Sequence, residues 1–223
     1  MAISFIAGSA QFLTGSASTI ATPTTLNVTT GDTIVVNVRI GNTTFPNLVT
    51  GVTDTAGNIY RLAAVIVSAN GIPQNVWYCT NCVANAANTI TATYNGATVN
   101  RAIAAAQFRG LATISPLDVC VVGQTSAANI TSPTFTTAVA NSIAVSVSEI
   151  DSTTSTWTVG AGYTEAIRDA SNVQLIQYQI FGSIQTGVTA TANNNTAVAK
   201  TIVVITLHET IVSGGGGEQS HTF

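Results

Sequence analysis

The sequence predicts an all-β protein, built as an antiparallel β-sandwich of about ten strands. Apolar and polar residues alternate with a period of two along most of the chain, which is typical of half-buried strands. Thr, Val and Ile are frequent, and their β-branched side chains suit a pleated surface better than a helix. Glu, Lys, Leu and Arg are too few to build amphipathic helices.

The alternation is clearest in four segments, each of which we expect to be a strand. These are 31–41, 88–95, 173–181 and 201–208. The first has an apolar face opposite a polar one, with Ile34, Val36, Val38 and Ile40 against Asn37 and Arg39. The last is apolar on both faces at its start, which predicts a strand in the middle of a sheet.

Weaker patterns predict further strands at 47–53, 59–67, 76–83, 101–109, 119–122, 142–150 and 186–192. Turns separate the strands, because Gly57 and the Asn95-Gly96 pair tolerate positive φ, whereas Pro73 and Pro116 interrupt a strand. The best helix candidate is a short turn near 163–170.

Both ends of the chain differ from the middle. Residues 1–25 are small, rich in Ser and Thr and weakly patterned, so we expect either an arm on a neighbouring subunit or an added edge strand. Residues 26–212 carry the sandwich pattern. Residues 213–223 include the run Gly214–Gly217 and are expected to form a flexible tail.

The chain is poor in charge. Only 7% of its 223 residues are charged, against roughly 25% in an average domain, and the net charge is −3. The six Lys and Arg residues are scattered, so we expect no binding to nucleic acid. The mean hydropathy is +0.40, yet no stretch approaches the ~18–20 consecutive apolar residues of a membrane-spanning helix. The first residues do not resemble a secretory signal peptide, so we expect synthesis in a cytoplasm.

The acidic residues and histidines form no recognisable catalytic set. Glu149 and Asp151 have equal parity and would share one face of a strand, but both lie near a loop, where solvated acids are usual. His208 and His221 are far apart in the sequence. We therefore expect no enzyme activity, no cofactor and no metal, with calcium at Glu149/Asp151 or at Asp169 as the weaker alternative.

The three cysteines leave their role open. Cys79 and Cys82 form a C-x-x-C motif, and Cys120 stands alone. A second such pair would indicate zinc, and a redox pair of the thioredoxin kind would begin a helix in a βαβ unit. We interpret the pair first as ordinary strand residues, with a local disulfide as the next reading and a metal site as the last.

Two aromatic side chains are candidates for contact with a glycan. Sugars stack on exposed aromatic rings, and Trp157 and Tyr163 both lie near predicted loops. For these two residues, burial in the core is an equally good interpretation. Trp77 lies in a predicted strand and is expected in the core.

Several segments follow one another in an order shared with a known group of proteins: Gly31–Val36 (GDTIVV), Val52–Leu62 (VTDTAGNIYRL), Val76–Cys79 (VWYC), Ala87–Tyr94 (ANTITATY), Ser115–Asp118 (SPLD), Thr136–Ile143 (TTAVANSI) and Gly160–Thr164 (GAGYT). In this order the chain resembles bacterial extracellular and phage-encoded β-sandwich modules over about residues 28–209. The resemblance implies a jelly-roll-like fold, a structural or binding role and no shared catalytic residues. The chain departs from the pattern at 107–110, where it reads Gln-Phe-Arg-Gly. It also lacks an acidic cluster after Gly162, which counts against calcium.

These observations favour a non-enzymatic structural protein of a phage particle: a capsid decoration, head-fibre or tail-appendage subunit located in the virion. Its partners would be copies of itself in a closed symmetric oligomer, such as a trimer, and other shell or tail proteins. Neutral surfaces suit such packing because buried unpaired charges are costly. One alternative is a carbohydrate-binding module for host attachment at a cell surface. Another is an extracellular filament or surface-layer subunit in which residues 1–25 donate a strand.

Overall fold

The computed structural model describes residues 2–41 and 48–210, and the regular structure of these residues is entirely β. They form 18 strands in five sheets, so the all-β prediction is confirmed. The number of strands exceeds the predicted ten. The missed strands include short ones such as β3 (Leu26–Val28) and β12 (Asn129–Thr131), which contain too few residues to show an alternation.

Residues 4–109 form the first half of the molecule, a five-stranded sheet covered on one face by shorter strands. The large sheet has the order β1 (Ser4–Leu13), β10 (Arg101–Arg109), β4 (Thr33–Arg39), β7 (Pro73–Cys79) and β6 (Arg61–Val67). The covering strands are β2 (Ala17–Ala21), β9 (Ile90–Thr98) and β5 (Val49–Asp54) in one sheet and β3 with β8 (Asn85–Asn88) in another. Apolar side chains such as Ile34 and Val36 fill the space between these layers.

Residues 117–208 form the second half in the same manner. Its large sheet has the order β11 (Leu117–Thr125), β18 (Lys200–His208), β13 (Ser142–Ile150), β16 (Gln174–Phe181) and β15 (Thr164–Arg168). The covering sheet consists of β12, β17 (Thr191–Asn194) and β14 (Trp157–Val159). Between them lies a second apolar core, which includes Ile130, Leu175 and Ile202.

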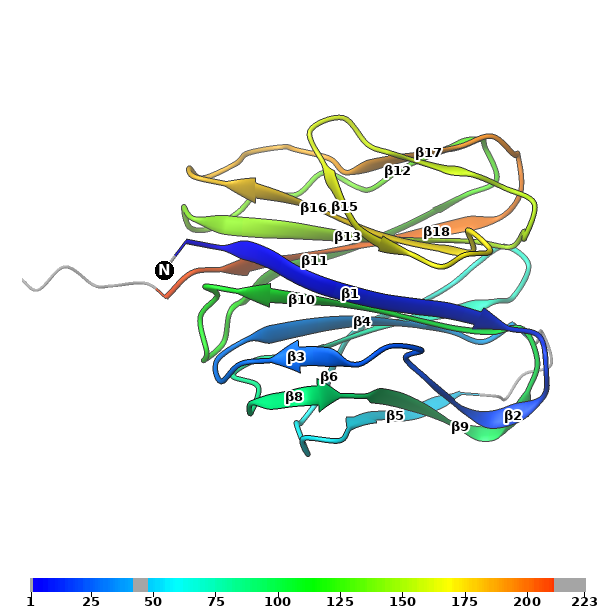
Figure 1. Cartoon of the computed structure of the whole chain (residues 1–223). Helices are drawn as coiled ribbons and strands as arrows, with labels where there is room; N and C mark the ends of the chain where they lie inside the picture. The colour runs from blue at the N-terminus through cyan, green and yellow to red at the C-terminus, as the bar shows by residue number, and fades with distance from the viewer. Residues whose placement is uncertain (1, 42–47, 211–223) are drawn as a thin grey trace, which may run out of the picture.

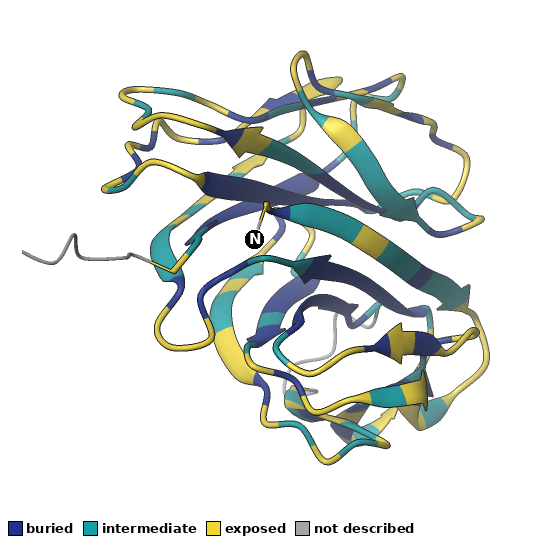
Figure 2. Ribbon diagram, turned by 60° about the vertical axis from the view of Figure 1, so that its left-hand side comes forward, coloured by how far each residue is buried: buried dark blue, intermediate teal, exposed yellow. Residues whose placement is uncertain are grey.

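The two halves pack on each other through their large sheets, as Figure 1 shows. A third apolar core fills this contact and includes Val35 and Phe108 from the first half and Val145 and Ile176 from the second. In this contact the first strand of each large sheet lies beside the last strand of the other sheet: β1 lies beside β15, and β11 lies beside β6. The two large sheets are therefore covered on both faces, which is why β4, β10, β13 and β18 are almost wholly buried (Figure 2).

The halves share one topology. With the strands of the second half numbered one to eight from β11 to β18, its sheets have the orders 1-8-3-6-5 and 2-7-4. The first half has the same orders once the small β3–β8 sheet is set aside. This is the strand order of a jelly roll in which the fifth strand pairs with the sixth instead of the fourth. The molecule is thus two jelly-roll-like sandwiches in tandem, and the prediction of one sandwich over 26–212 is corrected to two.

The strand registers relate the two halves residue by residue. Val35 pairs with Tyr78 in the first half, and Val145 pairs with Tyr178 in the second. Each large sheet also has a β-bulge at the same two places, one in its first strand and one in its fifth. The shared bulges and paired residues indicate an internal duplication with a pseudo-two-fold relation between the halves.

Most of the predicted strands are confirmed, and two predictions need correction. The candidate helix near 163–170 is strand β15, whose outer edge is unpaired. The segment 186–192 is largely a loop before β17, joined to Phe135 by one isolated bridge at Val188. Residues 1–25 supply edge strand β1 and strand β2 of this chain's own sheets, so of the two readings the structure has the edge strand. The predicted tail at 213–223 lies outside the described residues.

Candidate functional site

Of the two side chains expected to contact a glycan, Trp157 lies in the core of the second half and Tyr163 packs against this core. Trp157 is only 2% exposed and belongs to the apolar cluster between the two sheets. A ring buried this deeply has no free face for a sugar, so the glycan prediction at Trp157 is wrong. Tyr163 packs against the same cluster, and burial of its hydroxyl raises the pKa of the phenol above its usual value. Trp157 is therefore a core residue, whereas half-buried Tyr163 packs against the core and its contact with a glycan stays a prediction.

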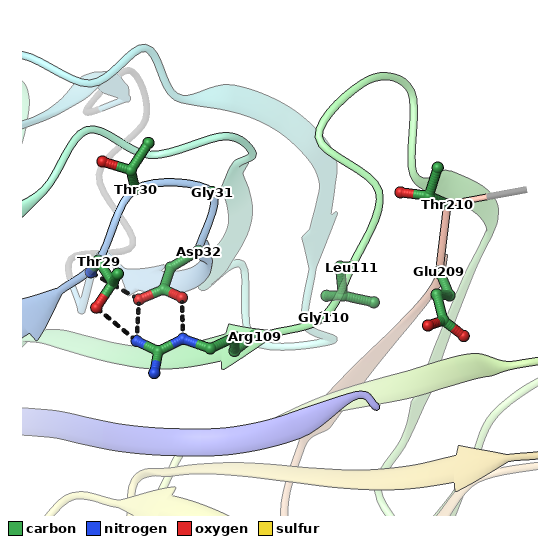
Figure 3. Close-up of a pocket in the computed structure, with 9 residues that line it drawn as sticks. All are labelled: Thr29, Thr30, Gly31, Asp32, Arg109, Gly110, Leu111, Glu209 and Thr210. Atoms are coloured by element: carbon green, nitrogen blue, oxygen red, sulfur yellow. Dashed lines mark hydrogen bonds and ion pairs between the residues drawn. The ribbon is translucent and has the colours of Figure 1, made fainter. Parts of the chain in front are cut away.

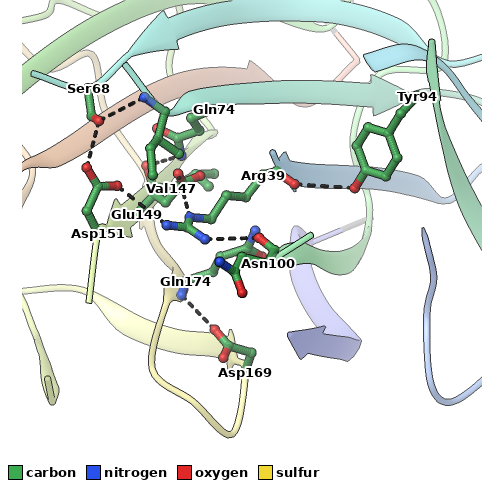
Figure 4. Close-up of polar contacts among 11 residues, drawn as sticks. Arg39, Ser68, Gln74, Tyr94, Asn100, Val147, Glu149, Asp151, Asp169 and Gln174 are labelled. Atoms are coloured by element: carbon green, nitrogen blue, oxygen red, sulfur yellow. Dashed lines mark hydrogen bonds and ion pairs between the residues drawn. The ribbon is translucent and has the colours of Figure 1, made fainter. Parts of the chain in front are cut away.

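The acids Glu149 and Asp151 share one face, as their parity predicts, but they meet an arginine from the other half. The Glu149 Oε1 atom lies 3.2 Å from Arg39 Nε, and Asp151 Oδ1 lies 3.6 Å from Arg39 Nη2 (Figure 4). Arg39 also donates a hydrogen bond to the Asn100 carbonyl, and Ser68 donates one to Asp151. Burial raises the pKa of Glu149 well above its usual value, while the nearby guanidinium opposes this shift.

This ion pair lies at equivalent positions of the two halves. Arg39 pairs with Gln74 in the first large sheet, and Glu149 pairs with Gln174 in the second. The polar face of this strand, which carries Asn37 and Arg39, is therefore buried where the two large sheets meet. Complementary charges at matching positions fasten the two halves together, which is a structural role.

Two other buried cations hold loops. Arg101 donates hydrogen bonds to the Gly15 carbonyl in the connection between β1 and β2 and to the Thr19 carbonyl in β2. Lys200 donates a hydrogen bond to the Ala127 carbonyl in the corresponding connection between β11 and β12. The registers of β10 and β18 place Arg101 and Lys200 at equivalent positions. The hydrogen-bond donors of both cations are paired with backbone carbonyls of the chain, so neither cation is available for a ligand.

A pocket lined by Asp32, Arg109 and Glu209 lies where the halves are joined. It has a volume of about 410 Å³ and is lined by the turn before β4, by the end of β10 with the two residues after it, and by the two residues after β18 (Figure 3). Asp32 accepts hydrogen bonds from Arg109 Nε at 2.7 Å and from the Thr29 amide at 2.8 Å. Burial opposes ionisation of Asp32, but the hydrogen bonds from Arg109, Thr29 and Gln107 outweigh it and hold its pKa below the usual value.

Two other acids, Asp54 and Asp169, shape turns, and Glu165 pairs with Arg168 on the surface. Asp54 accepts hydrogen bonds from Asn58, Tyr60 and Asn88, and Asp169 accepts them from the Ser171 and Gln174 amides. Within 2–41 and 48–210, no three His, Cys, Asp or Glu side chains gather in a way that could hold a metal ion.

The feature that stands out on the surface is the outer face of edge strand β6. Leu62 and Val65 are each 47% exposed and Val67 is 39% exposed, and these three side chains point away from the core between the halves. Ile59, just before the strand, is 80% exposed. We call Leu62, Val65 and Val67 the β6 stripe. The covering sheet of the first half does not extend over it.

The equivalent strand of the second half is charged at the same positions. The registers place Leu62 opposite Trp77 and Glu165 opposite Gln177, one residue before the shared bulge. Val65 and Arg168 are likewise equivalent, being paired with Asn75 and Leu175. Where β6 has Leu and Val, β15 therefore has the ion pair between Glu165 and Arg168, which is about one-third exposed. Charges on an edge strand are a usual protection against association. On β6 the charge is Arg61 at the start of the strand, and the β6 stripe itself has none.

Comparison with protein families, with curated protein sequences and with solved structures finds no match for this chain. In the described ranges, no helix is long and apolar enough to span a membrane. The function is therefore inferred from the fold and from the surface of the chain itself.

The β6 stripe was not found by sequence reasoning, although the segment was correctly predicted as a strand. Residues 62–67 are apolar at both parities, which is the pattern of a central strand covered on both faces. A run of this kind on an edge strand is an exposed apolar surface, but its place at the edge follows only from the topology.

Proposed function

We propose that this chain is a non-enzymatic structural subunit of a phage particle, a capsid decoration, head-fibre or tail-appendage protein, which assembles with copies of itself through strand β6. The observation that carries the proposal is the β6 stripe: three neighbouring apolar side chains on an unpaired sheet edge. Jelly-roll sandwiches are an architecture of viral shells, among other uses.

The internal duplication supports a second copy of the chain as the occupant of this edge. The two halves already form a pseudo-two-fold dimer within one chain, with ion-paired residues at equivalent positions. Their remaining difference at β6 and β15 is easily explained if only one of the two edges has a partner. Two β6 edges placed antiparallel are self-complementary, so the contact we propose is two-fold.

The chemistry of the surface supports the same reading. The charged side chains of the described residues are few, and those near the core are paired within the chain, so little charge must be desolvated when copies meet. The β6 stripe lies next to half-buried Trp77 on strand β7, which enlarges the apolar area available to a partner.

The test transfers the ion pair of the second half to the first. The variant Leu62→Glu/Val65→Arg places on β6 the residues that β15 has at the equivalent positions, so the fold is expected to tolerate them. Size-exclusion chromatography with light scattering should give an oligomer for the wild type and a monomer for the variant. The control Glu165→Ala/Arg168→Ala removes the β15 pair and should leave the oligomer intact. A monomeric wild type, or an oligomer that the transfer does not affect, would contradict assembly through β6.

The place of the protein in a particle needs a separate measurement. Mass spectrometry of purified phage particles should detect the wild-type chain, and the Leu62→Glu/Val65→Arg variant should be depleted from them. A chain that forms oligomers but is absent from particles would favour the alternative of an extracellular filament or surface-layer subunit.

A further inference from the structure

The C-x-x-C motif of the first half is arranged as a pair of thiols in contact. Cys79 ends strand β7 and Cys82 follows after two residues, with Asn81 at a φ of 53°. Their Sγ atoms are 2.9 Å apart, and the two side chains are 3% and 0% exposed within the core of the first half. Both cysteines are free in the structure. The turn therefore aims both sulfur atoms at each other and away from solvent.

The topology does not require this pair. The registers of β7 with β4 and of β16 with β13 make residues 74–79 equivalent to 174–179, so Gln179 is the counterpart of Cys79. The counterpart of Cys82, at the same spacing, is Gly182. Strand β16 continues to Phe181, whereas β7 ends at Cys79, so both the cysteines and the turn that brings their sulfur atoms together are particular to the first half.

We propose that Cys79 and Cys82 are a disulfide-forming pair that is oxidised by a small-molecule disulfide. One thiolate attacks the oxidant and releases one thiol from it. The second cysteine then attacks the mixed disulfide and releases the other. The two cysteines lose two electrons and two protons, and the oxidant is reduced to two thiols.

A pocket of about 350 Å³ gives access to this turn. Cys79, Thr80 and Asn81 line it together with Arg61 and residues 57–59. Burial and the contact with Cys79 raise the pKa of the Cys82 thiol, so its thiolate is scarce and reaction of the folded protein is slow. Refolding in the presence of the oxidant removes this barrier.

A Cys79–Cys82 disulfide would restrain the turn after β7 and the start of β4, to which this turn is hydrogen-bonded. The Cys82 amide donates a hydrogen bond to the Asp32 carbonyl at 2.9 Å, and the Cys82 carbonyl accepts one from the Gly31 amide at 3.0 Å. These two bonds attach the C-x-x-C turn to the start of β4, which carries the Asp32–Arg109 pair of the pocket in Figure 3. Closing the Cys79–Cys82 ring therefore stabilises the end of the first half at which the two halves are joined.

The test uses the full chain, refolded from urea with oxidised and reduced glutathione. Intact mass spectrometry should show the loss of two hydrogen atoms. Alkylation in denaturant without reductant should modify Cys120 and leave Cys79 and Cys82 unmodified. The oxidised protein should melt about 4–8 °C higher than the reduced protein. The variant Cys82→Ser should show no response of its Tm to the oxidant, and Cys120→Ser should respond as the wild type does.

Three results would overturn the proposal. The first is full alkylation of Cys79 and Cys82 after refolding in the oxidising buffer. The second is a stable glutathione adduct on either residue in place of the internal bond. The third is stoichiometric binding of zinc that protects both thiols, which would make the pair part of a metal site.

Discussion

Removal of the buried arginine between the two halves should be among the most damaging single changes to this fold. In the variant Arg39→Met, Glu149 and Asp151 stay buried without their cation. At 3.2 Å and an effective dielectric constant of about 20, the pair with Glu149 has a Coulomb energy of roughly 5 kcal/mol, most of which offsets desolvation. Breaking such a pair from one side costs about 3–5 kcal/mol.

The double variant separates the charge from the packing. Replacing both partners, in Arg39→Met/Glu149→Gln, removes the uncompensated charge at that site, so we expect most of the lost stability to return. The matched control is Glu165→Gln, which breaks the one-third exposed pair with Arg168 and should cost less than about 1 kcal/mol. Urea denaturation gives the free energy of unfolding of all four proteins.

The pH dependence gives a second readout of the same interaction. Glu149 has a raised pKa in the folded state, so stability is complete below its unfolded pKa of about 4.3 and is lost as pH rises through the folded value. Without Arg39 this loss grows, and the penalty of Arg39→Met should therefore shrink as the pH falls toward about 4. An Arg39→Met variant within about 1 kcal/mol of the wild type at neutral pH, or a double variant no more stable than the single one, would refute the reasoning.

Three further predictions concern the separate halves. Trp157→Ala should lower the free energy of unfolding by about 3–5 kcal/mol. Tyr163→Phe removes a buried hydroxyl without a hydrogen bond and should leave this free energy unchanged or raise it. Urea titration of both variants tests whether these side chains are part of the core. Because the pKa of Asp32 is lowered, its stabilising contribution is present above about pH 4 and is lost as pH falls through the folded pKa. The difference in the free energy of unfolding between wild type and Asp32→Asn should therefore vanish in acid. Equal differences at neutral and acid pH would contradict this. A Cβ added at Gly160 would lie 2.0 Å from the Thr191 carbonyl oxygen, so Gly160→Ala should cost at least about 1–3 kcal/mol, whereas Gly51→Ala meets no atom within 4 Å and serves as the control in thermal melts.

The sequence was sufficient to predict the fold class and most long strands, because alternation is a local property. The faces of residues 31–41 are as predicted, with Ile34 and Val36 in one core. The fate of the opposite face was not predictable in the same way. Asn37 and Arg39 are polar, and nothing local shows that a second sheet covers them. Their burial depends on contacts with residues more than one hundred positions away, such as Glu149.

The duplication had a signal in the sequence that alternation does not use. Gln74 and Tyr78 recur as Gln174 and Tyr178 with the same spacing, and their strand partners correspond. Few residues are identical between the halves, because a sheet position requires only a suitable shape and polarity. A search for repeats at a period of about one hundred residues would be the way to detect two sandwiches from such a chain.

The candidate site was the least predictable part. The exposure of Leu62 and Val65 depends on which strand lies at the edge and how far the covering sheet extends. Trp157 illustrates the converse, since it belongs to a short strand near a loop and is nevertheless buried in the core. Both outcomes depend on the order of strands, which hydrophobic patterns do not encode.

Amide hydrogen exchange of strand β6 tests the proposed assembly most directly. The wild-type oligomer is compared with the Leu62→Glu/Val65→Arg monomer, and strand β15 serves as the internal reference because it is the equivalent edge of the second half. We predict slower exchange in the oligomer for the amides of residues 61–67 and equal exchange in both proteins for residues 164–168. Equal exchange of β6 in the two proteins, or protection that appears at β15 instead, would contradict assembly through the β6 edge.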